Sequence, residues 1–186
     1  MKRAFYLFSA VLLIGVLTRL LPHWPNFTAV GAVALAGGAL YRSRWAAFLM
    51  PLVMLFLSDL LVNNFLFADY YAGFTWFTPG AAFIYGGFLL MTLIGRYGIG
   101  RQRNFVPVLG ASIGGSLVFY LVSNFGVWLG GTMYPLNLSG LVASYVAGLP
   151  FLLNQALATV LYASAIFGLA WYVLPRFSTR LKALRV

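Results

Sequence analysis

The sequence predicts an all-α integral membrane protein of six transmembrane helices, and its composition, its apolar runs and the placement of its charges support this class. Of its 186 residues, 62% are hydrophobic and only 8% are charged, and the mean hydropathy is +0.93. A soluble domain of this size cannot bury so much apolar surface. We therefore expect a single, multi-pass transmembrane domain over residues 1–186.

The apolar runs divide into six predicted spans. Lys2 and Arg3 precede the first run, which favours a retained anchor over a cleaved signal. Small residues dominate the second run, so we expect it to lie inside the bundle. Gly110 and Gly114 in the fifth run have the GxxxG spacing that is typical of helix packing. The predicted spans are 4–21, 29–41, 45–63, 80–95, 105–129 and 151–174, with a short surface helix over 141–149 that ends at a break formed by Gly148 and Pro150.

The basic residues orient these spans, because short cytoplasmic loops of membrane proteins are enriched in Lys and Arg. With the N-terminus inside, all basic clusters fall on the cytoplasmic side and only Arg19 falls outside. The opposite face receives an uncharged loop, 130–140, and an aromatic loop, 65–79, whose composition suits a lid at the membrane surface. Both termini are therefore predicted to be cytoplasmic.

A turn at residues 22–28 places the only histidine between the first two spans. Pro22 and Pro25 end the arriving helix, since each lacks a backbone donor and restricts the residue before it. Thr28 is suited to cap the next helix, which we expect to start near Ala29. Two interpretations stay open: an ordinary interfacial turn, or a turn in which His23 faces a ligand pocket at one membrane face.

Few residues suit catalysis. The chain has two acids, one histidine and no cysteine, and it contains neither an HExxH cluster nor a GxxxxGK[ST] phosphate loop. No nucleophile elbow accompanies its serines. We therefore expect no enzyme and no cofactor of the protein's own. We also expect no nucleic-acid partner, because the basic face carries no interleaved side chains that would stack bases.

Asp59 lies near the outer end of the third predicted span, where a carboxylate is costly unless it is paired or hydrated. Pairing with Arg19 and a role in a pocket are both open. Polar and aromatic side chains at the same predicted level outline an outward-facing small-molecule cavity. These side chains are His23, Asn26, Thr28, Asp59, Asn63, Asn64, Tyr85, Asn124, Trp128, Tyr134, Asn137, Tyr145 and Asn154.

Six short blocks, in order from the first predicted span to the last, carry a family resemblance. They are residues 19–28 (RLLPHWPNFT), 57–60 (LSDL), 124–129 (NFGVWL), 134–136 (YPL), 148–151 (GLPF) and 161–164 (LYAS). Together they resemble the BtuM-like family, solitary relatives of the substrate-binding S components of energy-coupling-factor transporters, which bind cobalamin. The resemblance implies an S-component-like bundle with an outward pocket around the corrin. Its candidate ligand-binding residues in this chain are His23, Asn26, Phe27, Asp59, Tyr85 and Tyr134, beside Asn124 and Asn154 from the polar level.

The implied function is uptake of cobalamin or a related corrinoid, with His23 as a candidate axial ligand to cobalt. Members that coordinate cobalt with a cysteine carry it in the span that aligns with 84–88, whereas this chain has no cysteine, so thiolate ligation does not carry over. The AxxxA spacing for docking on an energy-coupling module is missing from the first span, although Ala32 and Ala36 have it on the second. Such a module stays open as a partner. The alternatives are an S component for a different vitamin and a structural or assembly membrane protein without a pocket.

Overall fold

The computed structural model describes residues 13–41, 43–99 and 103–173, and within these ranges helices are the only regular secondary structure. Residues 13–20 are helical. The α-helices that follow are α2 (Val30–Leu40), α3 (Arg44–Leu61), α4 (Ala81–Ile94), α5 (Phe105–Leu129) and α6 (Leu138–Gly168). Turns of π-helix extend three of them, namely η1 (Val62–Leu66) after α3, η3 (Gly95–Ile99) after α4 and η4 (Leu169–Val173) after α6, and a 3-10 turn, η2, covers Ala68–Tyr70.

Four helical runs of the described chain are long and apolar enough to cross a membrane. They are Arg44–Leu66, Ala81–Ile99, Phe105–Leu129 and Leu138–Val173. The prediction of an all-helical, membrane-embedded, multi-pass chain is confirmed at this level. α2 is shorter: its 11 residues extend about 16 Å, against a hydrocarbon core of about 30 Å. Of the first predicted span, residues 4–12 lie outside the described residues.

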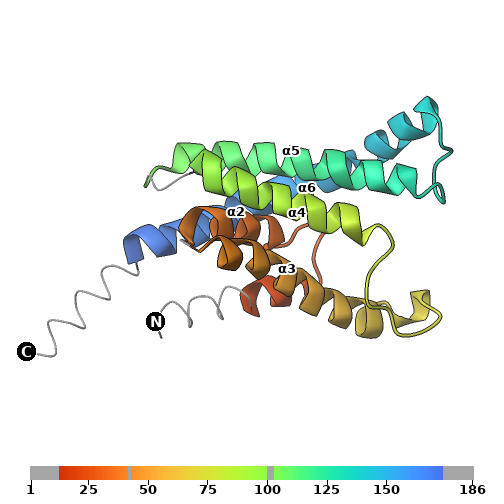
Figure 1. The fold of residues 1–186 in the computed structure, drawn as a ribbon, viewed down its shortest axis with the longest axis horizontal. Helices are drawn as coiled ribbons and strands as arrows, with labels where there is room; N and C mark the ends of the chain where they lie inside the picture. The colour runs from red at the N-terminus through yellow and green to blue at the C-terminus, as the bar shows by residue number, and fades with distance from the viewer. Residues whose placement is uncertain (1–12, 42, 100–102, 174–186) are drawn as a thin grey trace, which may run out of the picture.

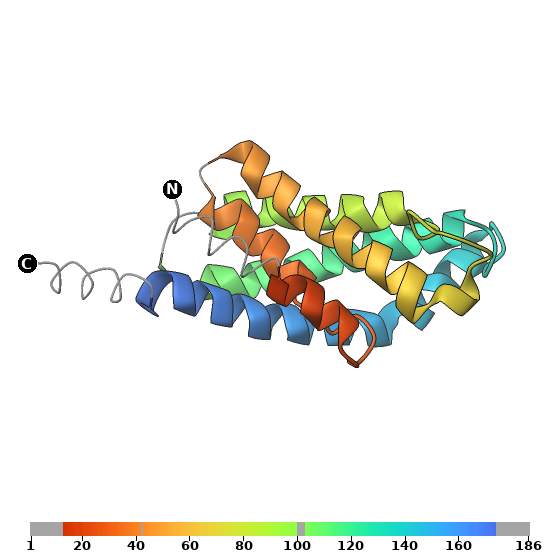
Figure 2. The same ribbon diagram turned by 90° about the horizontal axis from the view of Figure 1, so that it is seen from below.

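The long helices run side by side, and their loops gather at two ends of the bundle (Figures 1 and 2). At one end α2 and η3 finish and α3 and α5 begin, and this end carries Arg44, Arg96 and Arg103. We call it the basic end. The connections from α3 to α4 and from α5 to α6, with Asp69 on the first of them, lie at the opposite end. The other predicted basic clusters, at residues 2–3, 42, 101 and 176–185, lie outside the described residues.

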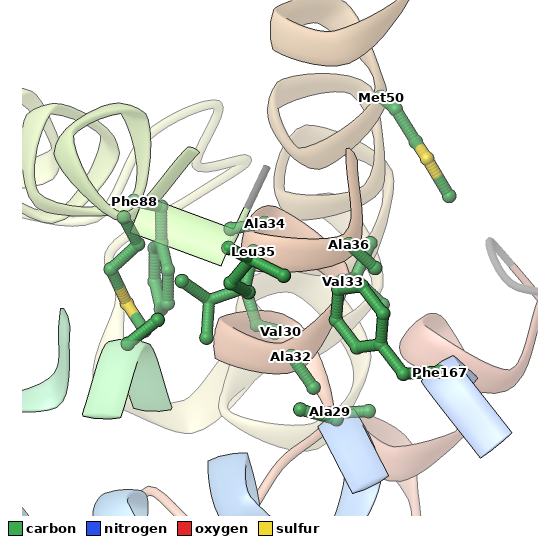
Figure 3. Close-up of a cluster of buried hydrophobic side chains, with 14 of the residues drawn as sticks. Ala29, Val30, Ala32, Val33, Ala34, Leu35, Ala36, Met50, Phe88 and Phe167 are labelled. Carbon is green, nitrogen blue, oxygen red and sulfur yellow. The ribbon is translucent and has the colours of Figure 1, made fainter. Parts of the chain in front are cut away.

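α2 forms the centre of the bundle, as its small residues predicted. All residues from Val30 to Gly38 are buried, and the helix contacts α3, α4, α5 and α6. Figure 3 shows its side chains between Phe88 of α4 and Phe167 of α6. A Cβ on Gly38 would meet the carbonyl oxygen of Thr92, and a Cβ on Gly95 would meet the backbone of Leu35. The absence of these two side chains therefore lets α2 approach α4 and its extension η3 at backbone distance.

The predicted break at Gly148 and Pro150 is wrong, because α6 continues from Leu138 to Gly168 with Pro150 inside it. The predicted surface helix 141–149 is instead the first part of α6, tilted from the remainder (Figure 1). Proline removes one helical hydrogen bond and kinks a helix without ending it when neighbours hold both sides. Here Ser144 donates a hydrogen bond of 2.9 Å to the carbonyl oxygen of Asn124 on α5.

The GxxxG pair in α5 does not pack within the described part of the chain. A Cβ on Gly110 or on Gly114 would meet no other atom within 4 Å. Isolated glycine spacing is weak evidence in a chain with 20 glycines, and the glycines that do make close approaches, such as Gly38 and Gly95, lie on other helices. The packing prediction for this pair is therefore wrong for the described residues.

Candidate functional site

The histidine turn, residues 21–28, is a fixed loop closed by its own backbone. The Phe27 N–H donates to the Trp24 carbonyl at 2.9 Å, and the Thr28 N–H donates to the Asn26 carbonyl at 3.0 Å. Asn26 has a φ of +61°, in the left-handed region that asparagine tolerates better than most residues. Asn154 of α6 donates from Nδ2 to the Pro25 carbonyl at 3.0 Å, which ties the turn to the last helix.

The predicted cap of α2 comes from a different residue. The N-cap position is Ala29, and its own side chain makes no capping bond. The Oγ1 of Thr18, in the preceding helical segment, accepts the Ala29 N–H at 3.1 Å and donates to the Gly15 carbonyl at 2.8 Å. Thr28 is therefore not the cap, because a threonine brought near by the fold satisfies the backbone donor at Ala29.

His23 is exposed on this turn, and one of its ring nitrogens is already engaged. Nδ1 lies 2.7 Å from the carbonyl oxygen of Trp24. A carbonyl oxygen only accepts, so Nδ1 carries the proton and donates. In the neutral ring, the lone pair is then on Nε2, which is the atom that can accept a hydrogen bond or bind a metal.

An open pocket of about 620 Å³ lies beside the turn, within the usual size range of small-molecule sites. Aromatic rings form much of its wall: Trp24 and Phe27 meet edge to face at 5.7 Å, and Phe27 meets Tyr162 at 6.2 Å. The lining side chains are Thr18, Leu21, Pro22, His23, Trp24, Phe27 and Tyr162. The pocket therefore joins the first helical segment and its turn to α6.

A charged cluster includes Arg19 of the same helical segment. Arg19 Nη1 is 2.6 Å from Asp59 Oδ1, with 20% of the arginine side chain and 5% of the aspartate side chain exposed. The Tyr85 hydroxyl donates to Asp59 Oδ2 at 2.7 Å. Arg19 also donates to Ser58 Oγ at 2.6 Å. Of the two environments open for Asp59, the structure has the ion pair.

Each oxygen of the Asp59 carboxylate binds a residue from a different element, so the cluster joins three elements. Arg19 comes from the segment that precedes the histidine turn, Asp59 from α3 and Tyr85 from α4. Charge-assisted hydrogen bonds are about twice as strong as neutral ones, and removal of either partner leaves a buried charge uncompensated. The cluster therefore fixes the segment that carries the pocket to the rest of the bundle.

The aromatic loop after η1 is tied down by two asparagines. Asn64 Oδ1 accepts the Thr75 N–H at 2.7 Å, and its Nδ2 donates to the Thr75 carbonyl at 2.9 Å. The Asn63 amide and the Thr78 hydroxyl lie 3.3 Å apart. Phe77 packs against Tyr85 with ring centroids 6.1 Å apart, so the loop reaches the charged cluster. The ring of Phe65 in η1 and the loop rings of Phe67, Tyr70, Phe74 and Trp76 are exposed, and Tyr71 is half-buried.

The remaining predicted residues lie at the α5–α6 end. Asn124 Nδ2 donates to the Tyr120 carbonyl of its own helix at 2.9 Å, and its side chain lies against Gly148. Tyr145 donates to the Leu121 carbonyl at 3.1 Å, and Asn137 caps α6 at Gly140 N at 2.9 Å. Tyr134 is half-buried in the connecting loop. These contacts join α5 to α6 and cap the start of α6.

The predicted site residues thus form three groups. His23 and Phe27 line the pocket, with Asn26 and Asn154 shaping its turn; Asp59 and Tyr85 belong to the charged cluster; Asn124 and Tyr134 belong to the α5–α6 end. The described residues bring together no group of three His, Cys, Asp or Glu side chains that would hold a metal by themselves.

Sequence reasoning missed the pocket roles of Thr18 and Tyr162. Both lie within apolar spans, and periodicity alone does not say which helix faces which neighbour. The only signal for Tyr162 was its place in the resembling block 161–164.

No curated protein and no solved structure matches the chain. A family model, described as a family of unknown function (DUF6580), matches residues 1–182. This match covers nearly the whole chain, so the chain belongs to that family.

Proposed function

We propose that this protein is a substrate-binding membrane transport protein that takes up cobalamin or a related corrinoid through the pocket at the histidine turn. The support comes from the resemblance to the BtuM-like family and from the pocket itself. It is aromatic, open and of small-molecule size, and it includes the side chain best suited to cobalt.

The hydrogen bond of His23 Nδ1 gives the strongest support to the proposal. The bond from His23 Nδ1 to the Trp24 carbonyl assigns the free lone pair of the neutral ring to Nε2, on a residue that lines the pocket. Metal-ligating histidines commonly donate their other ring N–H to a backbone carbonyl or a carboxylate, which fixes the tautomer and orients the ring. His23 has that arrangement, so the ring can bind an axial position of a corrinoid with little reorganisation.

The proposal includes an orientation in the membrane. Six spans, both termini in the cytoplasm and a location in the bacterial inner membrane would put the basic end inside and the aromatic loop outside. Arg44, Arg96 and Arg103 at one end and Asp69 at the other agree with this orientation, and the exception, Arg19, is paired with Asp59. Energy for transport would come from a partner such as an energy-coupling module.

The experiment is an absorbance titration of the purified protein with a corrinoid, because a bound corrin is coloured. A saturable shift of the corrinoid bands, at a stoichiometry near one, is expected. A parallel screen identifies any co-purifying small molecule by mass. A chain that leaves the corrinoid spectrum unchanged and carries another vitamin would contradict the corrinoid assignment and favour an S component of different specificity.

A further inference from the structure

The pocket lies at the side of the bundle. Residues 13–20 run along the outside of the molecule beside α6 and are drawn in red at the front of Figure 2. Leu21 and Trp24, which line the pocket, are 62% and 67% exposed. On α6, Leu161 next to Tyr162 is 59% exposed. The pocket rim therefore continues into apolar surface on both flanks.

The helical rise gives the depth of this opening. Tyr162 precedes the end of the helical run at Val173, at the basic end, by about 16 Å along the axis. Asn154, which binds the turn at Pro25, precedes the same point by about 28 Å. If a hydrocarbon core of about 30 Å starts at the basic end, the pocket lies between the middle of that core and the boundary distant from the basic end.

The histidine turn is also set back from the loops. In Figure 2 it stops well short of the end at which the α3–α4 and α5–α6 connections lie. Its depth and its position agree: in this placement the pocket would open toward the half of the bilayer that is distant from the basic end, and lipid would surround the opening.

Two polar groups of the pocket are engaged within the protein. The Thr18 hydroxyl donates to Gly15 and accepts from Ala29, and His23 Nδ1 donates to Trp24. His23 Nε2, the Tyr162 hydroxyl and the Trp24 indole N–H keep hydrogen-bonding capacity. The wall thus presents an apolar surface with a few polar atoms, which fits an amphipathic chain with an ester or similar polar group at its head.

We propose that the pocket binds an acyl chain of a phospholipid from the bilayer half distant from the basic end, with the lipid entering from the side. The chain lies against Leu21, Phe27 and Tyr162, and its ester region lies at the turn, where the Trp24 indole N–H can donate to an ester oxygen. This lipid site goes beyond the proposed corrinoid function and does not need it. Because the two ligands share side chains, a corrinoid in the pocket displaces the lipid chain.

Photo-crosslinking in vesicles tests this site. The full chain is placed in phosphatidylcholine vesicles that contain a trace of phospholipid with a photoactivatable group in the middle of one acyl chain, and adducts are mapped by peptide sequencing. We expect adducts on Phe27 and Tyr162 as well as on lipid-facing Leu161. Adducts on Leu161 with none on Phe27 and Tyr162 would overturn the proposal.

Two further arms make the result specific. Leu21→Trp, which fills the rim with apolar volume, should remove the pocket adducts and leave those on Leu161, and pocket adducts that persist unchanged in this variant would contradict a chain seated there. A free fatty acid with the same reactive group should label the pocket less than the phospholipid does; stronger labelling by the fatty acid would contradict a bilayer phospholipid as the ligand.

Crosslinking in the presence of added corrinoid distinguishes the lipid site from the proposed corrinoid uptake. Loss of the pocket adducts on addition of corrinoid supports both. Pocket adducts that persist, in a protein that also fails the absorbance titration, leave the lipid site standing and remove the corrinoid function.

Discussion

The carboxylate of Asp59 is bound at both oxygens, by Arg19 on one side and Tyr85 on the other, inside a bundle of apolar helices. Asp59 lies about 22 Å along the helix from the start of α3 at the basic end. That depth falls within a hydrocarbon core of about 30 Å, where an unpaired charge is costly. Loss of either partner should therefore lower the stability of the protein, since it leaves the other charge unpaired within the bundle.

Asp59→Asn should destabilise the protein by about 3 kcal/mol, because it leaves the Arg19 guanidinium without its counter-charge. In an Arg19→Gln background the same change should cost far less. The measurement is a double-mutant cycle of unfolding in detergent. Asp69→Asn is the matched control: it replaces the only other acid, which is exposed, and should shift stability by no more than about 0.5 kcal/mol. Additive losses for Asp59 and Arg19 would contradict direct pairing.

Single residues were predictable where chemistry limits the choice. The only histidine and one of only two acids were the natural candidates, and the Arg19–Asp59 pair was one of two open environments. Thr18 and Tyr162 were not predictable in the same way, because threonine and tyrosine are unremarkable within apolar spans. Their roles depend on which helix faces which, and that is a property of packing.

α2 has no amphipathic face because neighbours surround it on all sides. Its glycines and alanines are the cause, since small side chains let α4 approach to backbone distance at Gly38 and Gly95. This central position was predictable from composition. The continuity of α6 was not, because Pro150 and Gly148 read locally as a break, and contacts with α5 outweigh that local preference.

Two glycine substitutions separate packing from helix propensity. Gly38→Ala should destabilise the bundle by about 1–3 kcal/mol or more, because its Cβ would meet the Thr92 carbonyl oxygen. Gly110→Ala adds the same methyl group to a helix at an open position, and should be neutral or stabilising by up to about 1 kcal/mol. Thermal unfolding in detergent compares them. Equal effects at the two positions would show that the close approach of α2 to α4 is not the constraint.

At the scale of the whole molecule, charge placement predicts how the bundle sits in the membrane. The described arginines Arg44, Arg96 and Arg103 share one end, and the aromatic loop with Asp69 occupies the other (Figure 1). Topology reporters fused after Arg103 and after Val186 should both report cytoplasm, and a reporter within residues 68–77 should report the outer side. A C-terminus on the outer side would contradict the six-span proposal.

The proposed corrinoid site depends on His23 as the ligand to cobalt. The most direct measurement is a corrinoid titration of wild type and His23→Ala, with affinity and the cobalt-sensitive absorbance band recorded together as pH is lowered. We expect the variant to fold but to lose both the affinity and the band. We also expect wild type to lose the band on acidification, because a protonated imidazole has no lone pair for the metal. Equal affinity and an identical band in the two proteins would contradict it.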